Sequence, residues 1–253
     1  MACSYFSIVR GYMLHSADNV TDKALTAALR SFRVEPLQER ILADDAQFLR
    51  SDNKIASLVK VTLDGMPRDV RKLLEDEETD ERDFYQLPEL GSEDYEEGIY
   101  VLIYILEDGA IGFYVGTSQS LSERIKYHAQ IIAGNSFPNN LHYAFARKAV
   151  RTYKVCLTHV SGPQNRRLLE QAFILLIGTY GKKIISREIA TTNENSTHHY
   201  YNQEDALLLN SAATAAFEQV KWTPFRLRGE FFGLNTGSPM TDKTAYGERP
   251  IWV

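Results

Sequence analysis

The chain has 253 residues, a formal net charge of −5, 44% hydrophobic residues and 24% charged residues, which is typical of a soluble globular protein. Its two cysteines, Cys3 and Cys156, support neither a disulfide framework nor a zinc site, and no apolar segment reaches membrane-spanning length. We therefore expect an intracellular protein, nuclear or cytoplasmic, that does not bind a membrane; the sequence leaves its oligomeric state open.

The negative charge is concentrated in residues 75–97, which hold twelve acidic residues and one basic residue. Residues 98–230 carry a net charge of +4, and residues 1–74 carry +2. Because phosphate-binding surfaces are normally basic, this distribution leaves nucleic-acid binding open. The composition of residues 75–97 predicts a flexible acidic linker. Alternatively, this segment folds over a basic face and competes with nucleic acid for it.

Residues 1–74 are predicted to form a mainly helical accessory domain. Apolar spacing and helix formers predict a helix at Thr21–Phe32, and Pro36–Leu49 and Pro67–Leu74 predict two more, each with proline in the first turn. Ala56–Leu63 fits either a strand or a continued helix. The domain either has no chemistry of its own or contacts DNA or a partner.

A β-hairpin is predicted from residue 98 onward. Ile99–Leu106 is β-branched, aromatic and almost fully apolar, as expected of a strand covered on both faces. Asp108-Gly109 favours a tight turn, and a second apolar run ends at Tyr114-Val115-Gly116. The chain should therefore fold back antiparallel.

A helix is predicted to follow this hairpin. Ser120 and Glu123 fit a capping box, and apolar residues follow at helical spacing. Arg124 and His128 are four residues apart, so they project from one face of this helix.

The remaining elements follow the same kind of reasoning from periodicity and turn residues. They are a helix with an asparagine cap at Asn139–Val150, a strand at Thr152–Val160, a helix at Pro163–Thr179, a polar insertion at residues 182–201, a helix or a leucine-rich strand followed by a helix at Glu204–Val220, and a surface tail at residues 222–253.

Glu170 is the only acidic residue of the apolar helix Pro163–Thr179. A carboxylate there is costly to bury unless it is paired or binds a metal. A salt bridge with Arg166 or Arg167 is one interpretation, and a metal site is the other.

The two triplets Gly98-Ile99-Tyr100 and Tyr114-Val115-Gly116, followed by a helix with Arg124 and His128, resemble the core of the GIY-YIG nuclease family. Ser118 and Leu121 also match positions where this family carries a small hydroxyl residue and a leucine. The resemblance covers about half of the chain. It implies an α/β fold with a GIY-YIG-like three-stranded antiparallel sheet flanked by helices over residues 98–221.

The resemblance also implies an active site. Tyr100 and Tyr114 would line the catalytic cleft, and Tyr100 would help to position or deprotonate the attacking water. An unperturbed phenol titrates near pH ~10, so it needs a nearby cation to act as a base. Arg124 would neutralise the charge that develops on the phosphate, and His128 would lie beside it.

By the same resemblance, Glu170 would be the single protein ligand of Mg²⁺ (or Mn²⁺), with water and phosphate oxygens filling the other positions. Asn210 resembles best the asparagine that completes the family's site, and Asn193 and Asn195 are alternatives. Lys182 and Lys183 either contact the phosphate backbone or form the basic end of a helix.

The implied function is metal-dependent hydrolysis of a DNA phosphodiester bond, in duplex or branched DNA. Two alternatives stay open. The scaffold is a nucleic-acid-binding or interaction module without catalysis, or it is a nuclease that acts on RNA or branched DNA.

Overall fold

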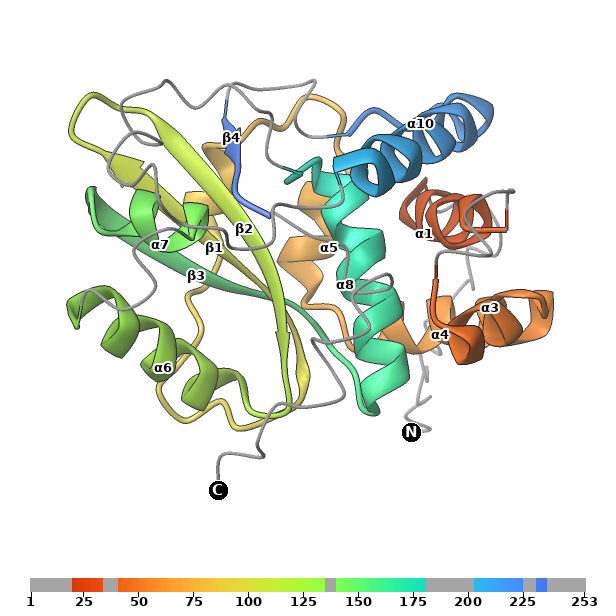
Figure 1. Cartoon of the computed structure of the whole chain (residues 1–253), viewed down its shortest axis with the longest axis horizontal. Helices are drawn as coiled ribbons and strands as arrows, with labels where there is room; N and C mark the ends of the chain where they lie inside the picture. The colour runs from red at the N-terminus through yellow and green to blue at the C-terminus, as the bar shows by residue number, and fades with distance from the viewer. Residues whose placement is uncertain (1–19, 34–40, 135–139, 181–202, 225–230, 236–253) are drawn as a thin grey trace, which may run out of the picture.

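A four-stranded mixed sheet flanked by helices forms the centre of the molecule (Figure 1). The computed structural model describes residues 20–33, 41–134, 140–180, 203–224 and 231–235. Within these residues there are eight α-helices and one short 3-10 helix, η1. None of the helices in this described part combines the length and the apolar character needed to cross a bilayer.

The sheet has the strand order β3-β1-β2-β4. Its strands are β1 (Gly98–Leu106), β2 (Ile111–Ser118), β3 (Ala149–His159) and β4 (Phe232–Gly233). β1 pairs antiparallel with both β2 and β3, and the predicted hairpin is present with Gly109 at a φ of 86° in its turn. β4 pairs parallel with β2, so the sheet has one strand more than the antiparallel sheet predicted from the sequence.

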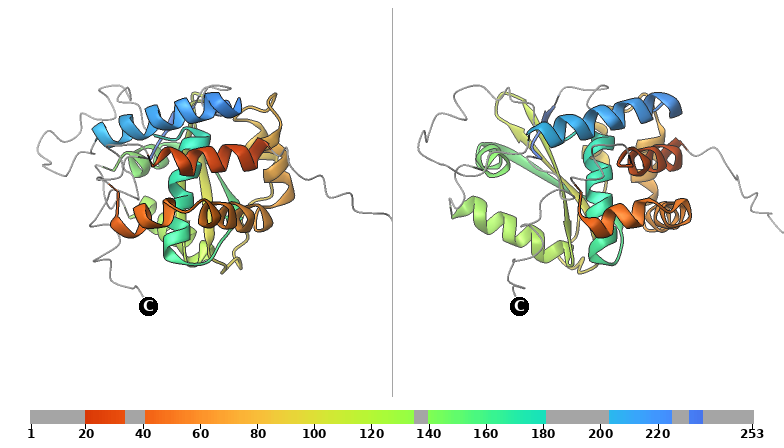
Figure 2. Two further views of the ribbon diagram at one scale, coloured as in Figure 1. Left: turned by 90° about the vertical axis from the view of Figure 1, so that its right-hand side faces the viewer. Right: turned by 45° about the vertical axis from the view of Figure 1, so that its right-hand side comes forward.

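Helices cover both faces of the sheet in separate layers (Figures 1 and 2). One face is covered by α6 and α7, and the other by α8, with α4 contacting β3 beside it and with α1 and α10 behind α8. The helices are α1 (Val20–Ser31), α3 (Ala43–Leu49), α4 (Asp52–Asp64), α5 (Arg68–Glu75), η1 (Asp83–Gln86), α6 (Leu121–Ala133), α7 (Leu141–Ala146), α8 (Pro163–Ile177) and α10 (Gln203–Val220).

Side chains of β1 alternate between two hydrophobic clusters, because successive residues of a strand point to opposite faces. Ile99, Val101 and Ile103 belong to the cluster that includes α8 and the N-terminal helices. Tyr100 and Tyr104 belong to the cluster under α6 and α7. The two predicted faces of this strand are therefore both buried, and the tyrosines share one of them.

The N-terminal helices are packed directly on the rest of the molecule. α1 contacts both α8 and α10, and its buried side chains share one cluster with the α8 face of the sheet. The open choice at Ala56–Leu63 is resolved as helix, within α4. Residues 20–33 and 41–74 thus share a hydrophobic core with the predicted nuclease domain.

The acidic segment at residues 75–97 is folded against the sheet. Phe84 is fully buried and packs edge-on to Phe113 with ring centroids 5.1 Å apart. Tyr85 stacks on Tyr153 of β3 at 4.9 Å, and the Leu90 N–H donates to the Lys154 carbonyl at 2.8 Å. A few aromatic and apolar residues therefore hold this highly charged segment against the sheet.

Three local predictions differ from the structure. The capping box at Ser120 is wrong, because the Ser120 side chain makes no capping hydrogen bond. The helix predicted at Asn139–Val150 ends at Ala146, and Ala149 already begins β3. The tail predicted at residues 222–253 is not only a surface segment, because it supplies β4 and the buried Leu234.

Candidate active site

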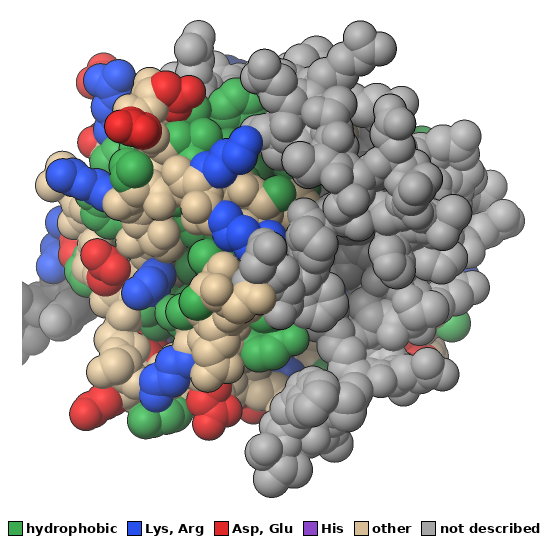
Figure 3. All heavy atoms as spheres, turned by 60° about the vertical axis from the view of Figure 1, so that its left-hand side comes forward, with side chains coloured by type: hydrophobic (Ala, Val, Ile, Leu, Met, Phe, Trp, Pro, Cys, Tyr) green, Lys and Arg blue, Asp and Glu red, His purple; other side chains and the backbone are tan. Residues whose placement is uncertain are grey.

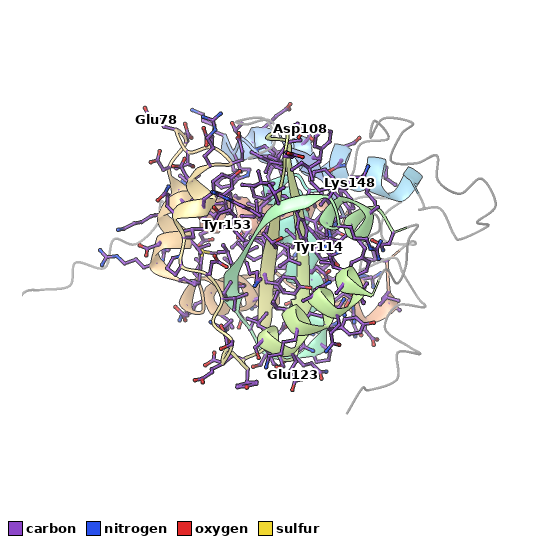
Figure 4. All side chains as sticks on the ribbon, turned by 90° about the vertical axis from the view of Figure 1, so that its left-hand side faces the viewer. Glu78, Asp108, Tyr114, Glu123, Lys148 and Tyr153 are labelled. Atoms are coloured by element: carbon purple, nitrogen blue, oxygen red, sulfur yellow. The ribbon has the colours of Figure 1, made fainter. Side chains whose placement is uncertain are left out.

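Tyr100 and Tyr114 lie on the α6 face of two neighbouring strands, with ring centroids 6.5 Å apart. Figure 4 shows Tyr114 at the centre of this face, between α7 and α6, with Lys148 above it and Glu123 below it. The Tyr100 ring crosses over Gly116: a Cβ at residue 116 would lie 2.5 Å from Tyr100 Cζ. Glycine at that position is what lets the phenol of one triplet cross the strand of the other.

The first triplet also has a steric reason for its glycine. A Cβ at Gly98 would lie 2.5 Å from the Thr158 carbonyl oxygen of β3 and 3.2 Å from Leu121 at the start of α6. Gly98 therefore allows close approach of β3 and α6, which brings α6 down onto the sheet.

His128 connects two phenols across the face under α6. Its Nε2 lies 2.7 Å from the Tyr100 hydroxyl and its Nδ1 lies 3.0 Å from the Tyr143 hydroxyl. His128 is only 2% exposed. The histidine selected by its spacing from Arg124 is thus in direct contact with the first signature tyrosine.

A second tyrosine–histidine pair, not predicted from the sequence, lies beside the first. His142 Nε2 lies 2.6 Å from the Tyr104 hydroxyl, and the His142 ring stacks on Tyr114 at 3.9 Å and 3°. His142 and Tyr143 are on α7, whose start is capped by the Asn140 side chain. Tyr104 follows Tyr100 by four residues on the same face of β1, and this is the signal that the sequence contained.

Both imidazoles are neutral at physiological pH. Burial lowers the pKa of His128 well below 6.5, and the charges of His142 and Arg124 lower it further. Burial, together with Arg124, lowers the pKa of His142 to about 3. A neutral imidazole has one N–H and one acceptor nitrogen, so each histidine can accept a proton from a tyrosine.

Arg124 and Tyr100 form a charged contact at this site. Burial raises the pKa of Tyr100 to about 12, while the charge and hydrogen bonding of Arg124 act against that rise. Burial by itself would lower the pKa of Arg124, but Tyr100 and Tyr114 raise it, so this side chain stays cationic. Arg124 Nε is buried and has no hydrogen-bond partner among the described residues.

Glu170 acts on Tyr100 from the helix behind the sheet. It is buried in α8, and its negative charge is one of the factors that raise the pKa of Tyr100. Arg166 contacts Glu97, and Arg167 makes two hydrogen bonds of 2.6 Å to Asp45. His128 thus contacts the Tyr100 hydroxyl directly, and the charges of Arg124 and Glu170 shift the pKa of that phenol in opposite directions.

Asn210, the asparagine predicted to complete the site, lies away from the tyrosine–histidine cluster. Asn210 lies on α10, which packs against α1 on the far side of α8 from the sheet (Figures 1 and 2). It is not brought to the tyrosine–histidine cluster, since α6 and α7 are on the opposite face. Asn193, Asn195, Lys182 and Lys183 lie outside the described residues.

A different asparagine, Asn235, contacts the second signature triplet. Its Oδ1 accepts hydrogen bonds from the Val115 N–H at 2.9 Å and from the Thr179 hydroxyl at 2.7 Å, and its Nδ2 donates to the Val115 carbonyl at 2.7 Å. The side chain is engaged on both ends, which is a structural role. Nothing in the tail around residue 235 indicated this contact, because it joins residues 120 positions apart.

The molecular surface over the α6 and α7 face of the sheet carries mixed charge. Figure 3 shows Lys and Arg side chains interspersed with Asp and Glu over the described part of the face, without one continuous basic patch. Tyr114 and Arg124 are half-buried, whereas Tyr100 and His128 are buried beneath them. Tyr114 and Arg124 therefore form the part of the site that faces solvent.

Comparisons of the chain with family models, with curated proteins and with solved structures found no match. The candidate site consequently rests on the geometry of the chain itself. That geometry is a cationic guanidinium, two neutral histidines, four tyrosines and one buried carboxylate around the paired signature strands.

Proposed function

We propose that this chain is a metal-dependent DNA endonuclease that hydrolyses a phosphodiester bond in a GIY-YIG-type site. The observation that carries the proposal is that His128 Nε2 lies 2.7 Å from the Tyr100 hydroxyl, while the charges of Arg124 and Glu170 both act on the pKa of that phenol. These groups come from β1, α6 and α8, which are distant along the chain. The antiparallel pairing of β3, β1 and β2 within the mixed sheet, with helices on both faces, is further support.

Tyr100 and His128 supply a route for the proton of the attacking water. Tyr100 with a pKa near 12 is a phenol at neutral pH, so it cannot accept a proton unless it gives one up. In the proposed step, the water proton passes to the Tyr100 oxygen while the Tyr100 proton passes to His128 Nε2. His128 then carries its other proton on Nδ1, facing the Tyr143 hydroxyl 3.0 Å away.

Arg124 supplies the positive charge at the phosphate. The side chain is half-buried and always cationic, and its buried Nε has no partner among the described residues. A preorganised guanidinium in a site of low dielectric stabilises charge that develops on a phosphate oxygen more strongly than it would in water. Arg124 is therefore assigned the role of holding the scissile phosphate against Tyr100.

Glu170 is the residue that fits a divalent cation at this site. A buried carboxylate is a hard oxygen donor, and Mg²⁺ commonly uses one or two such donors together with water and phosphate oxygens. When bound, Mg²⁺ or Mn²⁺ would neutralise charge on the phosphate and the leaving 3′ oxygen.

The test is a cleavage assay on linear duplex, branched and single-stranded DNA and on RNA, each with Mg²⁺ or with a chelator. We expect Mg²⁺-dependent cleavage of DNA, and a loss of roughly 10²–10³-fold or more in rate for Arg124→Ala and for Glu170→Gln. The matched controls are Arg151→Ala for Arg124→Ala and Glu123→Gln for Glu170→Gln, because each changes an exposed residue of the same type. Undiminished Mg²⁺-dependent cleavage by both Arg124→Ala and Glu170→Gln contradicts the proposal.

The second candidate is a nucleic-acid-binding or interaction module without catalysis. It is favoured by the burial of Tyr100, which is 0% exposed, because a water molecule must reach that hydroxyl in the hydrolytic step. The same assay separates the two candidates: binding of DNA without cleavage of any substrate, with Mg²⁺ or Mn²⁺ present, supports the silent module. Preference for RNA or branched DNA is read from the same panel of substrates.

A further inference from the structure

A second cluster of metal-ligating side chains lies where β3 ends, beside the first residues of β1. Cys156 Sγ and His159 Nε2 are 3.5 Å apart, and His159 Nε2 lies 3.9 Å from Asp94 Oδ2. The ligand atoms of these three residues all lie within 4.8 Å of one another. Cys156 lies opposite Tyr100 in the sheet and packs in the same hydrophobic cluster under α6 and α7.

A bulge in β3 is what brings the two strand residues together. Residues three apart in a regular strand point to opposite faces. In the pairing of β1 with β3, however, Ile99 is opposite Thr158 and Tyr100 is opposite Cys156, so Leu157 is an extra residue. Bulges of this kind re-aim the side chains that follow them, and His159 is thereby turned to the same side as Cys156.

Asp94 is held at this place by the start of α6. Its carbonyl accepts the Ser122 N–H at 2.7 Å, and the neighbouring Glu96 carbonyl accepts the Leu121 N–H at 3.1 Å. The backbone of residues 94–96 thus satisfies two of the free N–H groups at the helix terminus. The Asp94 side chain is left to face His159.

We propose that Asp94, Cys156 and His159 form a binding site for a borderline-soft divalent cation of the Zn²⁺ class. Thiolate, imidazole and carboxylate are the ligands that Zn²⁺ prefers, and bond lengths of about 2.3 Å to sulfur and 2.0–2.1 Å to nitrogen place tetrahedral ligands about 3.5 Å apart. The Cys156–His159 spacing has that value. The Asp94 oxygen needs to move by only about 0.6 Å to reach the corresponding spacing from nitrogen.

A second carboxylate, that of Glu96, lies beside His159, although His159 Nδ1 makes no hydrogen bond to the described residues in this orientation. Its second ring nitrogen, Nδ1, lies 3.2 Å from Glu96 Oε2. Histidines that bind a metal through one nitrogen usually face a carboxylate or carbonyl with the other, which sets the tautomer and the ring orientation. The three ligands leave one position for water, and a surface hollow lined by Tyr95, Glu96, Gln119 and His159 lies beside them.

Two other interpretations fit less well. A catalytic cysteine is partly exposed in electropositive surroundings, whereas Cys156 is buried and lies beside the Asp94 carboxylate. A Mg²⁺ site would use oxygen donors, and a sulfur ligand disfavours it. The sequence-based prediction of no zinc site considered only the number of cysteines. In the proposed site the other two ligands are a histidine and an aspartate.

Co²⁺ titration of the full chain, after metal removal, tests the site. Co²⁺ replaces Zn²⁺ in tetrahedral sites, and a thiolate ligand gives a charge-transfer band in the near ultraviolet. We expect one equivalent of Co²⁺ to produce this band, Zn²⁺ to displace it, and excess Mg²⁺ to leave it unchanged. Cys156→Ser should abolish the band, and Cys3→Ser, which removes the only other cysteine, should retain it.

Two further variants keep the proposal falsifiable if Cys156→Ser fails to fold. Asp94→Asn and Glu96→Gln keep the size of each side chain and should each weaken Zn²⁺ binding, measured by calorimetry, by roughly 10–100-fold. The proposal is overturned by absence of the band in the wild-type chain, by its persistence in folded Cys156→Ser, or by unchanged affinity in both carboxylate variants. Glu170→Gln should keep the band, so this result is independent of nuclease activity.

Discussion

Residue 116 has to be glycine because the phenol of Tyr100 fills the space where any other residue would place its Cβ. The two signature triplets are therefore coupled by sterics: the tyrosine of the first needs the glycine of the second. The same crossing carries the Tyr100 hydroxyl to His128, 2.7 Å away. A change at residue 116 should consequently act on both stability and the candidate site.

We expect Gly116→Ala to destabilise the fold by roughly 1–3 kcal/mol, the range for an overpacked core, because the added methyl collides with the Tyr100 ring. Urea unfolding measures this loss. Gly91→Ala is the matched control, since the nearest atom to its added Cβ is 3.9 Å away. The same substitution there should change the free energy of unfolding by less than about 1 kcal/mol. Equal effects of the two variants would contradict the steric account of the motif.

The buried histidines predict how stability depends on pH. The pKa of His142 is about 3 in the folded chain and ~6.5 in the unfolded chain. Between these values the unfolded chain binds a proton that the folded chain does not, so the free energy of unfolding falls as pH falls below about 6.5. At about pH 4 the loss from His142 is on the order of 3 kcal/mol, and His128 acts in the same direction.

His142→Gln removes this titration while leaving an amide that can bond the Tyr104 hydroxyl. We expect this variant to lose less stability than the wild type between about pH 7 and about pH 4, measured by urea unfolding at each pH. Parallel losses in the two proteins would show that His142 is not the group that titrates.

Spacing along one helix was enough to predict that Arg124 and His128 project from the same helix face, because residues four apart share a face. The same reasoning could not find His142 and Tyr143. Their partners are on β1 and α6, and the contacts arise only when α7 packs beside α6. Asn210 was assigned to a motif position by its order along the chain, and the structure does not bring it to the cluster, because α10 packs against α1.

Among the elements, the starts of α6 and α7 are stabilised in different ways. The Asn140 side chain accepts from the Tyr143 N–H at 3.3 Å, as a helix cap. At α6 the Ser120 hydroxyl is buried without a partner among the described residues, and the carbonyls of Asp94 and Glu96 take the helix N–H groups. Residues 94–96 thus perform the function that the capping motif predicted for Ser120.

This difference predicts unequal effects of the two cap substitutions. Asn140→Ala should destabilise the protein by about 1 kcal/mol, the usual effect of removing a helix cap. Ser120→Ala should have a smaller effect or be stabilising, since a buried hydroxyl without a partner is removed. Thermal or urea unfolding of the two variants gives the comparison. A greater loss of stability for Ser120→Ala than for Asn140→Ala would show that Ser120 caps the helix after all.

The elements predicted best are those with strong periodicity or an unambiguous turn, such as α1, α8 and the hairpin around Gly109. β4 was missed because two residues show no alternation, and its place is set by pairing with β2. Ala149 was assigned to a helix because it follows good helix formers. Pairing of β3 with the centre of the sheet overrides that local preference.

At the scale of the whole molecule, a buried ion pair joins the N-terminal helices to α8. Asp45 of α3 is 0% exposed, and it accepts two hydrogen bonds of 2.6 Å from Arg167 and one of 3.1 Å from Gln164. Composition predicted an accessory domain before an acidic linker, but it could not reveal that both segments are buried against the same helix and sheet.

We expect Asp45→Ala to destabilise the protein by roughly 3–5 kcal/mol, because the buried Arg167 then loses the carboxylate that accepts two of its hydrogen bonds. Asp64→Ala, which breaks the exposed pair with Lys60, should change stability by less than about 0.5 kcal/mol. Both losses are measured by denaturant unfolding. In Asp45→Ala, probes in α1 and in the sheet should report a single transition; two separate transitions would mean that the two parts unfold independently.

The contact of Asn235 with Val115 has a consequence for how the protein behaves at high concentration. β2 is an outer strand over most of its length, and such a strand offers unpaired backbone groups to strands of other molecules. The Leu234 N–H bonds the Phe113 carbonyl, and the Asn235 amide bonds both backbone groups of Val115, so a two-residue strand and one side chain together close this stretch. A chain cut before residue 231 would expose it as a template for intermolecular β-pairing and aggregation.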